Sequence, residues 1–217
     1  MLLPEFGIWN SFSSFAPMSS KNRIAIFASG SGTNAEEIFK YFKDHPTIEV
    51  VLLLSNNPSA YALIRAEKHG VDSKVFNRTQ FRESTVVLDW LSEKNVTHIV
   101  LAGFMWLVPD YLIQAYPDKI VNIHPALLPD FGGKGMYGMF VHEAVKKANR
   151  KETGITIHLV NEKYDEGRIL SQKSCSIEST DTPDDIAKKV HQLEYQHYPK
   201  VIEEWIESPQ STVNGQV

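Results

Sequence analysis

The chain contains very little cysteine: Cys175 is the only one in 217 residues. An intramolecular disulfide is therefore excluded, and a reducing compartment is favoured. A long apolar run is also missing, because the longest, at 99–108, is about half as long as a membrane helix must be. The first 20 residues have neither a basic start nor a continuous apolar core, which disfavours a signal peptide. These absences predict a cytoplasmic protein.

An excess of basic charge is absent as well. The chain has 22 Lys and Arg against 26 Asp and Glu, a formal net charge of −4, so it offers no broad basic field to nucleic acid. We expect small-molecule partners, no nucleic acid and no membrane, and the sequence leaves a homodimer open. With 42% hydrophobic residues the chain is long enough for one sizeable core. We predict one domain over residues 22–207, an N-terminal extension over 1–21 with Met18 as an alternative start, and a tail over 208–217.

Short apolar runs alternate with helical patterns along this domain, which is typical of a parallel sheet covered on both faces. The expected strands lie at 24–28, 50–54, 75–76, 99–102 and 120–123, with helices at 34–44, 62–68 and 80–94 and a short one from Pro109. A helix at 138–149, a strand pair at 155–160 and 169–177, and a closing helix from Pro183 to about Glu207 follow. The predicted fold is a single-domain, Rossmann-like α/β fold with a mostly parallel sheet, a C-terminal hairpin and a long last helix.

Asn122 and His124 follow the apolar run 119–121 and lie two residues apart. In a strand this spacing puts both side chains on the same face, and Pro125 then ends the pairing. The pair should therefore stand at the carboxyl end of a strand, where open α/β sheets bind their ligands. A carboxamide can stabilise an oxyanion, and an imidazole can donate or accept a proton near neutral pH.

Asp165 lies further along, in a hydrophilic stretch between two predicted strands. Taken alone it would be an ordinary turn residue. Next to His124 it could orient and charge the imidazole. Asn122, His124 and Asp165 together suggest chemistry on an acyl group.

A glycine-rich loop, 28–34, joins the first predicted strand to the first helix. Gly30, Gly32 and Ala35 fit G-x-G-x-x-G/A, and a helix N-terminus behind such a loop can bind phosphate. The acid that would hold the ribose of a nicotinamide dinucleotide is missing at 55–57. Two alternatives stay open: a tight turn capped by Thr33 or Asn34, and a nucleotide-binding module without acyl chemistry. The second leaves Asn122, His124 and Asp165 unexplained.

Other polar and aromatic residues carry weaker signals. His142-Glu143 begins like a zinc-protease motif, but Lys146 stands where the second ligand would be, so we expect no metal site. Cys175 has no evident base beside it and is expected to be passive. Trp106 is either a core residue or part of a flat hydrophobic pocket wall.

Five segments, taken in order, resemble the phosphoribosylglycinamide formyltransferase family of purine biosynthesis, and the resemblance extends from Arg23 to about Trp205. The segments are 29–34, 101–105, 122–129, 154–158 and the loop around Asp165. The resemblance implies transfer of a formyl group from 10-formyltetrahydrofolate, as co-substrate, to the primary amine of glycinamide ribonucleotide. The nearest rival within this enzyme class is a formyltransferase acting on an amino sugar.

The resemblance also implies site residues. The catalytic residues would be Asn122, His124 and Asp165. The ribonucleotide would be bound by Gly32, Thr33, Asn34 and Glu194. The folate would be bound by Arg82, Met105, Trp106, Leu107, Val108, Asn122 and Asn161, and no metal is implied.

The chain departs from the family pattern at two places. Trp106 stands where many relatives carry arginine, and the stretch 132–138 is unusually rich in glycine. Formyltransferases of methionyl-tRNA and of sugars usually continue Leu-Leu-Pro with Arg-Gly and add a C-terminal domain. Here Asp130-Phe131-Gly132 follows instead, which favours the phosphoribosylglycinamide enzymes.

Overall fold

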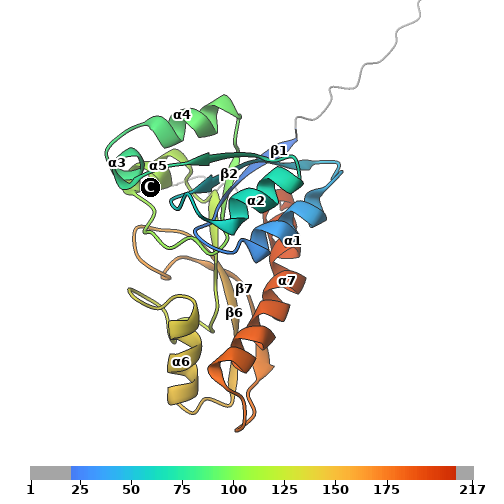
Figure 1. Ribbon diagram of the computed structural model, residues 1–217, viewed down its shortest axis with the longest axis vertical. Coiled ribbons are helices and arrows are strands. Elements are labelled where there is room, and N and C mark those ends of the chain that lie inside the picture. The colour runs from blue at the N-terminus through green and yellow to red at the C-terminus, as the bar shows by residue number, and fades with distance from the viewer. Residues whose placement is uncertain (1–20, 209–217) are drawn as a thin grey trace, which may run out of the picture.

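The computed structural model describes residues 21–208, and these form one mixed seven-stranded sheet (Figure 1). The strands are β1 (Asn22–Phe27), β2 (Ile48–Ser55), β3 (Asp72–Val75), β4 (His98–Leu101), β5 (Ile120–His124), β6 (Glu152–Leu159) and β7 (Ile169–Ser176). Their order is β3-β2-β1-β4-β5-β6-β7. Neighbours from β3 to β5 are parallel, whereas β6 runs antiparallel to β5 and β7 antiparallel to β6. The predicted mostly parallel sheet with a C-terminal hairpin is confirmed.

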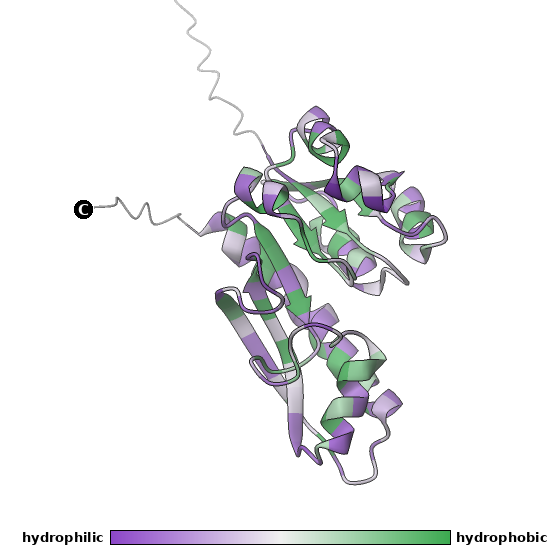
Figure 2. Cartoon of the chain, turned by 90° about the vertical axis from the view of Figure 1, so that its left-hand side faces the viewer, coloured by the Kyte–Doolittle hydropathy of each residue, from purple (hydrophilic) through white to green (hydrophobic). Residues whose placement is uncertain are grey.

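Helices cover both faces of the sheet. They are α1 (Thr33–Phe42), α2 (Tyr61–Lys68), α3 (Arg78–Arg82), α4 (Val86–Glu93), α5 (Asp110–Ala115), α6 (Met139–Lys147) and α7 (Pro183–Glu207). One core cluster combines strand residues with α1, α2 and α7, and the other combines them with α3, α4 and α5. Along β1, Ile24 and Ile26 belong to the first cluster and Ala25 and Phe27 to the second. The central strands β1, β2 and β4 are largely apolar because both of their faces are buried, as their green colour in Figure 2 shows. The edge strands β3 and β7 carry exposed polar residues instead.

The prediction of one helix over 80–94 is wrong, because α3 and α4 are separate helices. Asn77 and Gln80 form a capping box that starts α3 two residues earlier than expected. The Ser84 hydroxyl then donates to the Gln80 carbonyl, and the Thr85 hydroxyl donates to Asp89. Hydroxyl groups that bond to nearby chain groups compete with helix continuation, and here they accompany the break. The third strand also comes earlier than predicted, at Asp72–Val75.

The last helix is confirmed from Pro183 to Glu207. A capping box between Thr182 and Asp185 starts it, with proline in the first turn. The buried Tyr198 hydroxyl donates to the carbonyl of Leu101 at 2.8 Å and to that of Val121 at 3.3 Å. These bonds fix α7 against β4 and β5, close to the carboxyl ends of both strands.

The order of the strands reverses direction between β1 and β4, and ligands of open α/β sheets bind outside such a point. The loops after β1, β4 and β5 start at this edge of the sheet. Within residues 21–208, none of the helices is both long enough and apolar enough to cross a membrane. The predicted N-terminal extension and C-terminal tail fall almost wholly outside the described residues.

Candidate active site

A cavity of about 580 Å³ opens at the carboxyl edge of the sheet. Its volume is in the range of pockets that bind small molecules. The wall comes from the loops after β1, β4, β5 and β6 and from α6 and α7. It is formed by residues 30–34, 101–108, 122–125, 133–138, 142, 158, 160, 163–165, 191 and 194.

Asn122 and His124 both line this cavity from the end of β5, so the predicted placement on one face is confirmed. Asn122 Nδ2 donates to Nε2 of His158 at 3.2 Å, and the Nδ1–H of His158 donates to the Leu159 carbonyl at 2.8 Å. His158 stands directly opposite Asn122 in the antiparallel pairing of β5 and β6. Because an amide nitrogen carries two hydrogens, one N–H of Asn122 is left for a ligand in the cavity.

The His124 ring is almost fully buried, with 3% of its surface exposed. Its Nε2 donates to the Phe131 carbonyl at 2.8 Å, and its Nδ1 lies 3.5 Å from Oδ2 of Asp165. Burial lowers the pKa of His124, and this outweighs Asp165 and the Phe131 carbonyl, which both favour the charged ring. The free site thus differs from the expected charged imidazole: the ring is neutral at neutral pH, with oxygen atoms beside both nitrogens to stabilise an added proton.

Asp165 reaches this group from the loop between β6 and β7. Its Oδ1 lies 3.6 Å from His158 Nε2, and its Oδ2 accepts the Gly133 N–H at 2.9 Å. Burial by itself raises the pKa of Asp165, but His158, His124 and the Gly133 N–H together bring the pKa below its usual value. Asp165 is therefore a carboxylate that lies between two imidazoles.

Gly132, the first residue of the glycine-rich stretch 132–138, lies close to Asp165. A Cβ on Gly132 would lie 2.5 Å from Leu128 Cδ2 and 3.3 Å from Asp165 Cβ. A larger residue at this position would require the Leu128 side chain, and to a smaller extent Asp165, to shift.

Gly32 begins α1 at the other end of the cavity, with a φ of +70°. A Cβ at this position would lie 2.6 Å from Cα and Cβ of Ala62, so only glycine fits. The alternative of a turn capped by Thr33 or Asn34 is wrong, because no side chain caps α1. The uncapped first turn of α1 faces the cavity, which is the arrangement that binds phosphate.

Asn34 and Glu194 meet in the wall beside this loop. Asn34 Nδ2 donates to Glu194 Oε2 at 2.9 Å, and Glu194 is 6% exposed. Burial raises the pKa of Glu194 to about 7, although the hydrogen bond from Asn34 opposes the shift. Asn34 Oδ1 is also buried and has no hydrogen-bond partner among the described residues.

The predicted folate residues divide into two groups. Met105, Trp106, Leu107 and Val108 line the cavity. Trp106 also packs against Phe76, Phe81 and Phe104, so it is both core residue and pocket wall. Arg82 and Asn161 are not brought to the wall: the Asn161 side chain accepts the N–H of Lys163 in its own turn. Their roles in folate binding stay predictions.

Sequence reasoning missed His158, Phe131 and Gly133, which hold the polar group in place. Only His158 left a signal, because it alternates with Ile155, Ile157 and Leu159 along a predicted strand, which puts it on the same face as Thr156. The contributions of Phe131 and Gly133 come from backbone atoms, and backbone atoms leave no mark in the sequence.

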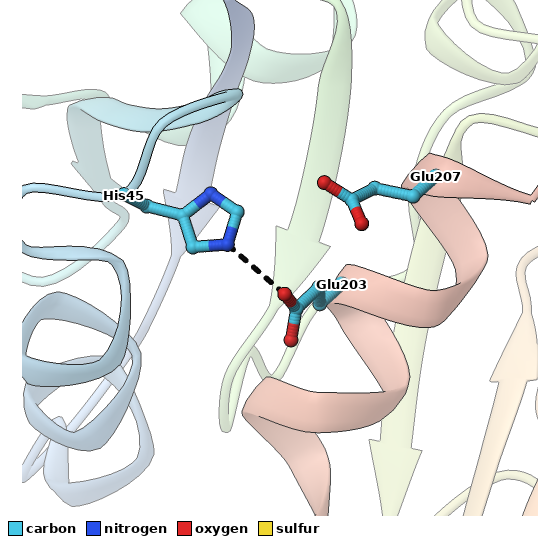
Figure 3. A group of neighbouring side chains, drawn as sticks. All are labelled: His45, Glu203 and Glu207. Atoms are coloured by element: carbon cyan, nitrogen blue, oxygen red, sulfur yellow. Dashed lines mark hydrogen bonds and ion pairs between the residues drawn. The ribbon is translucent and has the colours of Figure 1, made fainter.

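His45, Glu203 and Glu207 form a group of metal-ligand type away from the cavity (Figure 3). His45 Nδ1 accepts the backbone N–H groups of Thr47 and Ile48, so the ring proton is on Nε2, which donates to Glu203 at 3.0 Å. A metal would need the lone pair that this proton occupies. The group therefore serves as a hydrogen-bonded contact between α7 and the segment before β2. That the protein uses no metal stays a prediction.

Comparison with known proteins gives consistent matches. A family model described as formyl transferase matches residues 22–202. The chain is 38% identical to phosphoribosylglycinamide formyltransferase of Bacillus subtilis, over 84% of this chain and 93% of that protein. It is 39% identical to the chloroplastic phosphoribosylglycinamide formyltransferase of Arabidopsis thaliana over 84% of this chain, but it spans only 64% of that longer protein. The crystal structure of phosphoribosylglycinamide formyltransferase from Bacillus halodurans matches with a TM-score of 0.77 and 38% identity, over 86% of this chain and 96% of that one.

Proposed function

The chain belongs to the phosphoribosylglycinamide formyltransferases, and from this premise we propose that it transfers the formyl group of 10-formyltetrahydrofolate to the primary amine of glycinamide ribonucleotide. The observation that carries the proposal is the polar group of Asn122, His124 and Asp165 in the cavity wall, in which His158 contacts both Asn122 and Asp165. Family membership alone would not distinguish an active enzyme from an inactive relative. An intact polar group of this kind is what the chemistry requires.

The proposed reaction begins when the amine nitrogen attacks the formyl carbon, so that a C–N bond forms and negative charge develops on the formyl oxygen. The free N–H of Asn122 would donate to this oxygen, and such a donor contributes about 3 kcal/mol in comparable sites. The amine proton would pass to the neutral His124 ring. The carboxylate of Asp165 and the Phe131 carbonyl would stabilise the resulting imidazolium.

The intermediate would then collapse. The bond between the formyl carbon and the folate nitrogen breaks, and the proton that His124 holds passes to this departing nitrogen. Because the attacking and leaving groups are both nitrogen, no external oxidant, reductant or water enters the balance. Most of the rate would come from positioning and from stabilisation of the developing charge.

The two substrates would bind to different parts of the cavity. The uncapped first turn of α1, with Gly32, Thr33 and Asn34, would hold the phosphate of the ribonucleotide, and Glu194 would lie beside the ribose. Met105 to Val108 would hold the pterin through main-chain groups and apolar contact. In this arrangement the formyl end of the bound folate would point toward His124.

A formyl-transfer assay tests the function directly. The purified protein is given 10-formyltetrahydrofolate and glycinamide ribonucleotide, and the release of tetrahydrofolate is followed. Parallel reactions replace the ribonucleotide with an amino sugar or with water alone. We expect turnover with the ribonucleotide that is at least a hundredfold faster than with the other acceptors. Equal or faster turnover with the amino sugar, or none with the ribonucleotide, would contradict the proposal.

We further propose a cytoplasmic location, which rests on the single cysteine. The relatives include bacterial and chloroplastic proteins, so an organelle is the alternative. Cell fractionation decides between these, and light scattering on the purified protein tests the homodimer that the sequence leaves open.

A further inference from the structure

His142 is a buried histidine in the cavity wall to which the reaction above assigns no role. It lies on α6, directly after the glycine-rich stretch 132–138, and only 2% of its surface is exposed. Its ring packs edge-on against that of His191 from α7, with 6.4 Å between the ring centres. Both residues line the cavity, and Glu194 lies one turn further along α7 from His191.

The ring of His142 has no hydrogen-bond partner among the described residues. Its Nδ1 is fully enclosed and unpaired. The other histidines near the chemical centre differ: both ring nitrogens of His124 and of His158 have polar partners. Buried polar atoms are almost always paired in folded proteins, so an unpaired one in a ligand cavity indicates a partner that arrives with the ligand.

The surroundings of His142 select the kind of partner. Burial lowers the pKa of this ring to about 4, with His191 and His124 adding to the effect, so the imidazole is neutral at physiological pH. A neutral imidazole offers one donor and one acceptor and has no charge with which to bind a phosphate. It suits a hydroxyl or an amide. The only other unpaired buried atom in this wall among the described residues, Asn34 Oδ1, belongs to the same end of the cavity.

We propose that His142 binds the ribonucleotide directly, through a hydrogen bond to a neutral polar group between its phosphate and its amine. The group is a ribose hydroxyl or the glycinamide carbonyl, because these are the neutral polar groups that such a substrate carries between its two ends. This inference rests on the proposed function. His142 is then a substrate-binding residue that increases the affinity for the ribonucleotide and does not affect the affinity for the formyl donor.

His142→Phe tests the proposal, because it keeps a flat ring and removes both nitrogens. We expect the KM for the ribonucleotide to rise about tenfold, the loss of one good hydrogen bond. The KM for the formyl donor and kcat should change less than about twofold. The melting temperature should stay the same or rise, since no bond within the protein is lost. His142→Asn returns a polar atom near the position of Nδ1 and should recover part of the affinity.

His98→Phe is the matched control. His98 is also a buried histidine, its pKa is also lowered to about 4 by burial, and it packs against Trp205 away from the cavity. This variant should leave both KM values unchanged. A ribonucleotide analogue without ribose hydroxyls distinguishes a hydroxyl partner from the glycinamide carbonyl. If a hydroxyl is the partner, His142→Phe should bind the analogue as well as the wild type does. If the carbonyl is the partner, His142→Phe should still bind the analogue about tenfold more weakly than the wild type does.

Failure of the proposed function and failure of the inference about His142 give different results. Wild-type protein without formyl transfer to the ribonucleotide would overturn the proposed function and this inference with it. Active wild-type protein together with an unchanged ribonucleotide KM in His142→Phe would overturn this inference alone. A parallel rise of both KM values, together with a lower melting temperature, in His142→Phe and in His142→Asn would show that the role of His142 is structural. Should His142→Phe not fold, titration of the ribonucleotide into His142→Leu, which also removes both ring nitrogens, gives the same decision, with unchanged affinity as the contrary result.

Discussion

The two ends of the cavity differ in how their polar groups are paired. At the chemical end, Asn122, His124, His158 and Asp165 pair with one another and with backbone groups before any substrate is present. At the end for which we propose ribonucleotide binding, Asn34 Oδ1 and His142 Nδ1 are buried without a partner in the described part of the chain. The first arrangement holds groups in fixed positions around developing charge, where mobility would cost rate. The second leaves groups whose pairing, in our proposal, the substrate completes, and this would give specificity.

Electrostatics separates the same two ends. Asp165 stays ionised although it is buried, because two imidazoles and an N–H face it. Glu194 has only Asn34 as a partner, and burial raises its pKa to about 7. A carboxyl group with many partners is thus a fixed charge, while one with few partners changes its charge near neutral pH.

The largest effect should come from the chemical end. His124→Ala removes the proton acceptor, and Asp165→Asn removes the charge that stabilises the protonated ring. Each should lower kcat by about 10²–10⁴-fold and leave both KM values within a few fold. Steady-state kinetics on purified variants measures this, with His98→Ala as a control away from the cavity. A large rise in the ribonucleotide KM at normal kcat would contradict the division into two ends.

A smaller effect is expected on stability from Glu194. Its folded pKa of about 7 is above the ordinary 4.5, so the folded protein holds the proton to higher pH than the unfolded chain does. The protonated Glu194 therefore contributes roughly 3 kcal/mol to the free energy of unfolding. This contribution is fully present below about pH 4.5 and is lost as the pH rises through about 7.

The variant Glu194→Gln cannot lose a proton and should escape this loss. Urea unfolding of both proteins at pH 5 and pH 8 measures the difference, and the contribution of the buried histidines cancels because both proteins contain them. We expect the free energy of unfolding of Glu194→Gln to increase relative to that of the wild type between pH 5 and pH 8. The exposed Glu143→Gln serves as control, and a Glu194→Gln difference that does not vary with pH would show that Glu194 is ionised throughout.

The smallest effect should come from the phosphate loop. Gly32→Ala forces a side chain into a left-handed conformation and against Ala62, and it should cost about 2 kcal/mol of unfolding free energy while raising the ribonucleotide KM. Gly30→Ala is the control, since nothing lies within 4 Å of its Cβ, and its stability should stay within about 0.5 kcal/mol of the wild type. Equal destabilisation by the two substitutions would show that the steric fit at Gly32 has no special role.

The sequence predicted features that depend on neighbouring residues. Asn122 and His124 are two residues apart, so any strand puts them on one face, and Pro125 ends that strand. The start of α7 follows from Thr182 and Asp185, which form a capping box, and from Pro183 in the first turn. Gly32 was recognised because its loop pattern is local as well. The prediction for 80–94 failed at Ser84 and Thr85, where hydroxyl bonds outweighed the apolar spacing.

By itself, the sequence determined most of the helices and strands, the mostly parallel sheet and the pair of polar side chains at the end of a strand. Each of these follows from alternation, caps and turns within a few residues. Only the tertiary structure decided the rest. The antiparallel register brings His158 opposite Asn122, and the packing of α6 on α7 encloses His142. Burial lowers the pKa of His124 and raises the pKa of Glu194. These properties depend on desolvation and on contacts between segments far apart in the chain, and such contacts exist only once the whole domain has packed.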